Sequence, residues 1–278
     1  MTADRFAEFR ALHHATKPLL LPNAWDYASA AALADAGFAA VGTTSLGVAA
    51  AAGKPDAEAA TLQETLTLAR SITGLPCPVS VDMEAGFGGG PAQVADLAEQ
   101  LAELGIAGIN IEDGRPDGTL ADLTAQRELI STVKARVPHL FVNARTDAFW
   151  LGTPEPLSEA LTRTATFADA GADGVFVPGI AADADIAAIT AKTGVPLNVL
   201  FMPNRHTVEG LTALGVRRIS TGSLLFRAAL HATIRTALTV RDSAPVTADL
   251  PTYDQVMALT APGQRGAAVR VSDSHRSR

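Results

Sequence analysis

Apolar residues in this chain fall into short runs that alternate with longer amphipathic segments. Eight of the runs have the length and composition of buried β-strands, and each is followed by a segment compatible with a helix. The predicted strands are residues 19–25, 39–45, 78–84, 108–112, 140–145, 174–177, 196–201 and 217–221. Before the first strand, residues 4–14 are expected to form a short helix whose apolar stripe is Phe6, Phe9 and Leu12.

Several connections share one feature: a glycine follows the end of a predicted helix, shortly before the next strand. It occurs at Gly37, Gly105, Gly171 and Gly215. Glycine there can end a helix in the left-handed backbone conformation. Eight strands alternating with helices favour a (β/α)8 barrel. A doubly wound open sheet is the alternative, but it more often carries a glycine-rich fingerprint after its first strand, which residues 22–26 lack.

We therefore expect an α/β protein: a (β/α)8 TIM barrel with an N-terminal helix and a C-terminal helical extension. The predicted catalytic barrel domain covers residues 1–242. The extension, residues 243–278, is expected to contain a helix near residues 252–260 and then a mobile tail from Pro262.

The composition narrows the class of protein. The chain has 278 residues, 47% of them hydrophobic, and a formal net charge of -7, which argues against nucleic-acid binding. No apolar run approaches the ~20 residues of a membrane helix, and the N-terminus lacks the apolar core of a secretory signal. The single cysteine, Cys77, excludes an internal disulfide. We therefore expect a cytoplasmic protein that acts on a small molecule.

Acidic residues gather at the ends of two neighbouring predicted strands. Side chains alternate along the third strand, so that Asp82 and Glu84 are expected to share its polar face. Glu112 and Asp113 end the fourth strand, and Asp56 lies in the loop after the second. Because barrels of this kind carry their chemistry at the C-terminal ends of the strands, these acids are expected to converge.

Converging carboxylates need a counter-charge. Two of them ~4 Å apart repel by about 1 kcal/mol in water and several times more in a protein, so their pKa values rise or a cation lies between them. The candidate ligands are all hard oxygens, which favours Mg²⁺, with Mn²⁺ second, and disfavours zinc. They are Asp82, Glu84, Glu112 and Asp56. The alternative is that these are surface acids paired with arginines.

Groups that can bind an anion are predicted on the same side. Arg145 ends the fifth strand, and its guanidinium can hold a carboxylate or phosphonate at two points. A salt bridge to Glu112 is its other possible role. Backbone N–H groups can hold the opposite end of such a substrate. They belong to the segment that contains Thr44, Ser45, Leu46 and Gly47.

Two further side chains follow strand ends. His206, after the seventh strand, can exchange protons or contact a substrate, although an exposed loop histidine is the simpler explanation. Trp25, after the first strand, can form a wall of the substrate pocket, and packing is the simpler explanation there.

Several motifs together resemble those of the isocitrate lyase/phosphoenolpyruvate mutase superfamily. In chain order they are Pro22 with Asp26, then residues 41–49, 53–56, 81–88, 110–113 and 143–147. The resemblance runs from about residue 18 to residue 225. It implies a Mg²⁺-dependent barrel that acts on 2-oxo acids through an enolate. It also implies a tetramer of paired dimers that exchange a C-terminal helix.

The resemblance also implies roles for single residues. Asp82 would bind the metal directly, and Arg145 would bind the substrate carboxylate. Water bound to the metal would be held by Asp56, Glu84 and Glu112. The oxyanion would be bound by a loop of three residues, Thr44, Ser45 and Leu46. The expected catalytic residues are thus Asp82, Arg145, Glu112 and Thr44.

One loop departs from the family pattern. Lyases of the family carry lysines, a histidine and a cysteine after the fourth strand, and the cysteine acts as the general acid. Residues 114–123 of this chain contain none of these residue types. Phosphonate mutases and hydrolases of the family place lysine and asparagine or threonine there, and only Thr119 matches them. Cleavage of isocitrate or methylisocitrate is therefore expected to be slow or absent.

The sequence thus predicts a Mg²⁺-dependent lyase or decarboxylase. It would cleave a C–C bond in a small 2-oxo or 2-hydroxy di- or tricarboxylate through an enolate, as a homo-oligomer (dimer or tetramer). Two alternatives stay open. One is P–C bond chemistry on phosphonopyruvate or phosphoenolpyruvate, by a mutase or a hydrolase. The other is a barrel that binds a 2-oxo acid without turnover.

Overall fold

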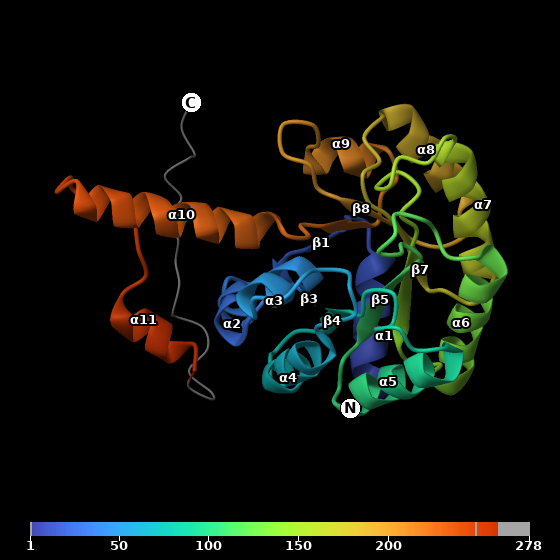
Figure 1. The fold of residues 1–278 in the computed structure, drawn as a ribbon, viewed down its shortest axis with the longest axis horizontal. Helices are drawn as coiled ribbons and strands as arrows, with labels where there is room; N and C mark the ends of the chain where they lie inside the picture. Colours follow the sequence, from blue (N-terminus) through green and yellow to red (C-terminus); the bar gives the residue numbers. More distant parts are fainter. Residues whose placement is uncertain (1, 248, 261–278) are drawn as a thin grey trace.

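A computed structural model describes residues 2–247 and 249–260, and Figure 1 shows them as a barrel of parallel strands surrounded by helices. The strands are β1 (Leu19–Leu21), β2 (Asn23–Ala24), β3 (Val41–Thr43), β4 (Val79–Asp82), β5 (Gly108–Glu112), β6 (Phe141–Arg145), β7 (Gly174–Val177), β8 (Leu197–Leu200) and β9 (Arg218–Ser220). The helices are α1 (Thr2–His13), α2 (Tyr27–Asp35), α3 (Ser45–Ala51), α4 (Leu62–Ile72), α5 (Pro91–Glu103), α6 (Leu123–Arg136), α7 (Pro156–Asp169), α8 (Asp183–Lys192), α9 (Val208–Ala213), α10 (Leu224–Arg241) and α11 (Tyr253–Ala258).

The sheet closes on itself through its first strand. Its order is β1-β9-β8-β7-β6-β5-β4-β3-β2, and all neighbours are parallel. β1 and β2 are two pieces of one strand, separated by Pro22, which has no N–H to donate to a neighbour. β1 pairs with β9 and β2 pairs with β3, so this one strand joins both edges. The prediction of an eight-stranded (β/α)8 barrel is confirmed.

The connections from helix to strand contain left-handed glycines at the four positions that the sequence predicted. The φ angles of Gly37, Gly105, Gly171 and Gly215 are +87°, +93°, +98° and +81°, in the left-handed region. A residue with a Cβ is strained in this conformation, whereas glycine is not. Each of these glycines therefore lets the chain leave a helix and enter the next strand within a few residues.

The N-terminal helix closes one end of the barrel. Phe9 of α1 is fully buried, and its ring centroid lies 5.3 Å from that of Phe141 on β6. Gly108, at the start of β5, leaves room for this ring, because a Cβ there would come within 2.8 Å of Phe9. The helix thus fills the end of the barrel opposite the C-terminal ends of the strands.

The last two helices leave the body of the barrel. In Figure 1, α10 runs outward from the barrel and α11 returns toward α2. The Tyr27 hydroxyl donates to the carbonyl oxygen of Leu259 at 3.0 Å, which ties the end of α11 to α2. The mobile tail predicted from Pro262 lies outside the described residues. Among the helices described here, none is both long enough and apolar enough to cross a membrane.

Candidate active site

A cavity of about 440 Å³ lies at the C-terminal ends of the strands. Asp82 at the end of β4, Glu112 at the end of β5 and Arg145 at the end of β6 all line it. Four further residues named from the sequence also line it: Asp56, Thr44, Ser45 and Leu46. The structure therefore brings together the acids and the arginine that sequence reasoning placed at separate strand ends.

Arg145 is held between two buried acids. Its Nη1 lies 2.5 Å from Oε2 of Glu112, and its Nε donates to Oδ1 of Asp147 at 2.7 Å. The side chains of Glu112 and Asp147 are 7% and 4% exposed. Because parallel pairing sets Glu112 opposite Arg145, the backbone register itself fixes this contact.

The cavity holds more acids than the single arginine beside them can neutralise. The pKa values of Asp82 and Glu112 are both raised. Burial raises the pKa of Asp82 above its usual value, and nearby Asp56 adds to this. Burial, followed by the charges of Asp82 and Asp147, raises the pKa of Glu112 to about 8, although Arg145 opposes the rise. Burial disfavours the charge on Arg145, but Glu112 and Asp147 keep its pKa above the usual value. The cluster therefore carries more negative charge than it can stabilise without a proton or a cation.

The donor set suits a hard divalent cation bound mainly through water. Oxygen Oδ1 of Asp56 is buried and has no hydrogen-bond partner among the described residues. The Asp82 carboxylate accepts only long bonds, from the N–H groups of Ser45 at 3.4 Å and Glu84 at 3.3 Å. Within the described part of the chain, however, no group of three or more His, Cys, Asp or Glu side chains is arranged to hold a metal ion. Mg²⁺ usually keeps several waters and takes one or two carboxylates, and the oxygens here fit that pattern.

A buried arginine lies beneath the cavity. Arg218 on β9 is 1% exposed, and its Nη2 donates to Oδ1 of Asn110 at 3.1 Å. Its Nε donates to the Ser220 hydroxyl at 3.2 Å, and both Asn110 and Ser220 line the cavity. Burial lowers the pKa of Arg218 to about 9, while the charge of Asp82 opposes this. Arg218 does not line the cavity itself, so it acts on a ligand only through Asn110 and Ser220.

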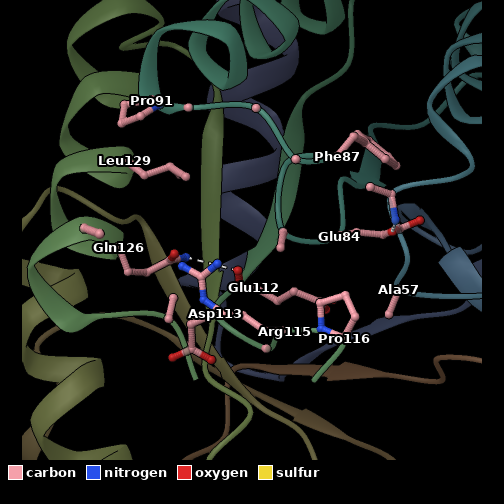
Figure 2. Close-up of a pocket in the computed structure, with 18 of the residues that line it drawn as sticks. Ala57, Glu84, Phe87, Pro91, Glu112, Asp113, Arg115, Pro116, Gln126 and Leu129 are labelled. Carbon is pink, nitrogen blue, oxygen red and sulfur yellow. Dashed lines mark hydrogen bonds between the residues drawn. The ribbon is translucent and has the colours of Figure 1, made fainter. Parts of the chain in front are cut away.

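Glu84 faces a second cavity of about 400 Å³ rather than the first. Its two carboxylate oxygens accept from the Thr61 hydroxyl at 2.5 Å and from the Ala59 N–H at 3.1 Å. Figure 2 shows Glu84 on one side of this second cavity and Gln126 of α6 on the other, with Glu112 between them. Glu112 and Ala57 line both cavities. The role of Glu84 in holding metal-bound water stays a prediction.

Asp113 does not join the acids of the first cavity. It is fully buried, lies 3.1 Å from Nη1 of Arg163 on α7, and accepts from the Asp147 N–H at 2.8 Å. Arg163 also donates to the carbonyl oxygen of Ala121 at 2.9 Å. Alternation explains the difference, because Glu112 and Asp113 are successive residues and point to opposite sides of the strand. Asp113 anchors the loops around the site instead of lining it.

The loop after β5 closes on itself as a short hairpin. Gly114 and Leu120 form an antiparallel bridge, and the Arg115 N–H donates to the carbonyl oxygen of Thr119 at 2.9 Å. Oδ1 of Asp117 accepts from both the N–H and the hydroxyl of Thr119. None of the residues of this hairpin lines the first cavity. The hairpin therefore supplies no proton donor there.

Three other residues named from the sequence do not line the first cavity: Gly47, Trp25 and His206. Gly47 is buried in α3, where a Cβ would come within 2.7 Å of the Trp25 Cβ. Trp25 packs edge-on against Phe226, with ring centroids 5.3 Å apart. His206 is 7% exposed, and its Nδ1 accepts from the Met202 N–H at 3.2 Å. Their substrate-binding roles stay predictions.

Sequence reasoning missed several residues that line the cavity. Asn23, Asn110 and Ser220 are polar residues inside buried strands, and that signal was available in the sequence. Arg227 on α10 and Trp150 on the loop after β6 could not be identified in this way. The pattern of apolar and polar residues does not show in which direction a loop or an outer helix runs.

Comparison with known proteins gives one family match over most of the chain. Residues 9–241 match the model of the family described as phosphoenolpyruvate phosphomutase. The chain is 41% identical over 251 residues to uncharacterized protein Rv1998c of Mycobacterium tuberculosis, covering 90% of this chain and 95% of that protein. It is 33% identical over 187 residues to 2-methylisocitrate lyase of Salmonella typhimurium, covering 62% of this chain and 61% of the lyase.

A solved structure shares the fold. The structure of oxaloacetate acetylhydrolase in complex with the product oxalate superposes with a TM-score of 0.82 and 25% sequence identity. The superposition covers 92% of this chain and 94% of the acetylhydrolase.

Proposed function

Because the chain belongs to the phosphoenolpyruvate phosphomutase family, in the isocitrate lyase/phosphoenolpyruvate mutase superfamily, we propose that it is a Mg²⁺-dependent lyase or decarboxylase. Its substrate would be a small 2-oxo or 2-hydroxy acid, whose C–C bond breaks to leave an enolate. The observation that carries the proposal is that Asp82, Glu112 and Arg145 line one cavity at the ends of adjacent strands. The names of two relatives, a 2-methylisocitrate lyase and an oxaloacetate acetylhydrolase, support a small carboxylate substrate.

Each residue of the cavity has a distinct task in this proposal. Arg145 binds a substrate carboxylate through the guanidinium N–H groups that Glu112 and Asp147 leave free, those of Nη2 among them. The backbone N–H groups of Ser45 and Leu46 orient the oxygen that becomes negative. Arg218 stabilises the anion from beneath through Asn110.

Asp82 would hold the divalent ion directly, with Asp56 and Glu112 bound to it through water. The ion supplies Lewis-acid polarisation of the 2-oxo and carboxylate oxygens when bound. Glu112 must lose its proton for this role. Burial raises its pKa to about 8 when no cation is present, and a divalent ion bound beside it would oppose that rise.

Carbon–carbon chemistry is favoured over P–C chemistry by the loop after β5. The hairpin that begins at Gly114 carries neither the lysine of phosphonate enzymes nor the cysteine of the tricarboxylate lyases. A reaction that needs a proton donor from this loop is therefore disfavoured. Decarboxylation or cleavage that leaves a stabilised enolate, to be protonated by water, does not need one.

A panel of three substrates tests the proposal. We expect the protein with Mg²⁺ to consume oxaloacetate and to leave phosphonopyruvate unchanged, with little or no cleavage of methylisocitrate. Proton and phosphorus NMR of the reaction mixtures measures all three. Turnover of phosphonopyruvate alone would support the P–C alternative. Oxalate binding without turnover of any substrate would support a barrel that binds a 2-oxo acid and does not react with it.

We also propose that the chain forms a homo-oligomer through its last two helices. Leu230, Ile234 and Leu238 recur every four residues on α10 and are 49%, 59% and 37% exposed. This spacing sets them on one face of the helix. On α11, Val256 and Met257 are 44% and 49% exposed. Apolar patches of this kind commonly mark protein interfaces.

Replacing Ile234 by glutamate is expected to shift the protein to a smaller species in sedimentation velocity, because a charge would be buried in the interface. Ala232→Glu, on the opposite face of α10, is the matched control and should sediment like the unmodified protein. A monomer before any substitution would contradict the proposal.

A further inference from the structure

The loop that carries Asp56 has a strained backbone. We call residues 54–61, between α3 and α4, the Asp56 loop. Ala57 and Ala59 both have a φ angle of +58°, in the left-handed region that residues with a Cβ rarely adopt. A conformation of this kind persists only where the surrounding structure determines it. The Asp56 loop therefore needs contacts with other parts of the chain to keep its shape.

Apolar packing does not supply these contacts. Ala57, Glu58 and Ala59 are exposed, so their side chains bury little surface. Near the start of the loop, Nζ of Lys54 donates to the carbonyl oxygen of Ala60 at 2.9 Å. The Lys54 side chain is 37% exposed, however, and water competes for a hydrogen bond in such a position. A stronger anchor has to be buried.

Glu84 is a buried anchor that holds the loop at two points. It is 3% exposed, and its two carboxylate oxygens accept from the Ala59 N–H at 3.1 Å and from the Thr61 hydroxyl at 2.5 Å. Thr61 is the N-cap residue of α4, but its hydroxyl makes no capping bond and donates to Glu84 instead. Figure 2 shows Ala57 beside Glu84 on one wall of the second cavity. Both oxygens of Glu84 are therefore engaged by the Asp56 loop, and Glu84 does not line the first cavity.

Asp56 depends on the backbone of this loop for its position. It lines the first cavity, and its Oδ1 is buried without a hydrogen-bond partner among the described residues. Since no hydrogen bond orients that oxygen, the path of the loop does. Ala57 is the next residue in the chain, so a change in its left-handed conformation would turn Asp56 away from the cavity.

We infer that Glu84 is a positioning residue: by binding the Ala59 N–H and the Thr61 hydroxyl, it keeps the Asp56 loop in its strained conformation and Asp56 in the first cavity. In this role Glu84 does not bind metal-bound water itself. The inference rests on the proposed function, in which Asp56 binds Mg²⁺ through water. Replacing a group that orients a metal ligand typically weakens metal binding about tenfold to 100-fold.

Hydrogen exchange in the absence of metal tests the contact between Glu84 and the loop. Glu84→Ala removes both acceptors, and the Asp56 loop is expected to exchange at least about tenfold faster, as for the loss of hydrogen bonds to a charged group. Glu84→Gln keeps both contacts, because its amide oxygen accepts from the Ala59 N–H and its amide nitrogen donates to the Thr61 oxygen. Its exchange should therefore stay within about threefold of that of the unmodified protein. Mass spectrometry of peptides from the loop measures the rates, with peptides from β6 as the reference for global unfolding.

Mg²⁺ affinity tests the consequence for the site. We expect Glu84→Ala to bind Mg²⁺ at least about tenfold more weakly in isothermal titration calorimetry. One part of this loss comes from the missing charge and the other from the released loop. Adding Ala57→Gly and Ala59→Gly relieves the strain, because glycine adopts a left-handed backbone without steric cost. The glycines restore no charge, so a recovery of at least about threefold would measure the positioning effect alone.

Two further variants complete the test. Glu58→Ala is the matched control, because it removes a carboxylate from the same loop where the side chain is exposed. It should change neither the exchange rate nor the Mg²⁺ affinity by more than about twofold. Thr61→Val removes only the hydroxyl that donates to Glu84, and it should speed exchange of the loop in the same direction as Glu84→Ala. It tests the same contact if Glu84→Ala fails to fold.

The outcomes keep this inference apart from the proposed function. Unchanged exchange in Glu84→Ala and Thr61→Val would show that Glu84 does not hold the loop. Faster exchange without any recovery of Mg²⁺ affinity in the glycine variant would show that Glu84 acts on the ion itself. Either result overturns the positioning role and leaves the proposed function standing. If the unmodified protein binds no Mg²⁺, the proposed function fails and the positioning role fails with it.

Discussion

Replacing Arg145 by methionine is expected to lower the free energy of unfolding by about 3–5 kcal/mol and to abolish oxalate binding. The stability loss follows because Glu112 and Asp147, both buried, would lose the cation that lies 2.5 Å and 2.7 Å from them. Removing one partner of a buried ion pair leaves an unpaired charge in a low-dielectric region, and that costs more than the pair contributes. Urea denaturation followed by circular dichroism measures the change.

Arg136 is a matched control for this effect. It also bridges two acids, Asp96 at 2.7 Å and Glu99 at 3.1 Å, but its side chain is 43% exposed. Because exposed ion pairs contribute little, Arg136→Met is expected to leave the urea midpoint nearly unchanged. If both variants lost the same free energy of unfolding, burial of the ion pairs around Arg145 would make no contribution to stability.

A double variant separates folding from binding at Arg145. Adding Glu112→Gln to Arg145→Met removes one of the two buried carboxyl groups left without their arginine, so part of the lost stability should return. Oxalate binding should not return, because the guanidinium that holds the carboxylate is still absent. Recovery of binding together with stability would assign Arg145 a purely structural role.

The barrel and the positions of the main site residues could be predicted from local patterns. Short apolar runs, helix-ending glycines and the rule that chemistry lies at strand ends were enough to bring Asp82, Glu112 and Arg145 to one cavity. Each of the three is the last residue of its strand, so alternation within a regular strand fixes its side.

The same rule fails two residues beyond the end of β4. Glu84 was expected to share a face with Asp82, but β4 ends at Asp82 and Glu84 has a positive φ of 50°. A left-handed residue breaks the two-residue alternation, which turns the Glu84 carboxylate toward Thr61 and the second cavity. The sequence shows the glycines that follow, but not where the extended backbone stops.

Three residues that line the first cavity could not be predicted, for a related reason. Trp150 and Met202 lie on loops after β6 and β8, and Arg227 lies on a helix that leaves the barrel. Hydrophobic periodicity identifies helices and strands, but it does not give the path of a loop. These three residues were therefore the least visible in the sequence.

Replacing Asp82 by alanine is expected to weaken oxalate binding by at least about 1000-fold, roughly 4 kcal/mol. In the account above, Asp82 is the one protein group that binds the divalent ion directly, so its loss removes the ion and the charge that holds oxalate. The fold should survive, because burial raises the pKa of Asp82 and its carboxylate accepts only bonds of 3.3 and 3.4 Å. Removing the carboxylate therefore relieves more repulsion between acids than the hydrogen-bond energy it loses.

Asp117→Ala is the control for this substitution. Asp117 lies on the hairpin after β5 and lines neither cavity, so its loss should leave oxalate affinity unchanged. Matching urea midpoints for the two variants and the unmodified protein would show that any loss of binding is local.

The most direct test of the account is a calorimetric titration of oxalate into three samples. They are the unmodified protein with Mg²⁺, the same protein with EDTA, and Asp82→Ala with Mg²⁺. The account predicts binding in the first sample and none in the other two. Equal oxalate affinity with EDTA, or in Asp82→Ala, would contradict the claim that the acids at the strand ends bind oxalate through a divalent ion.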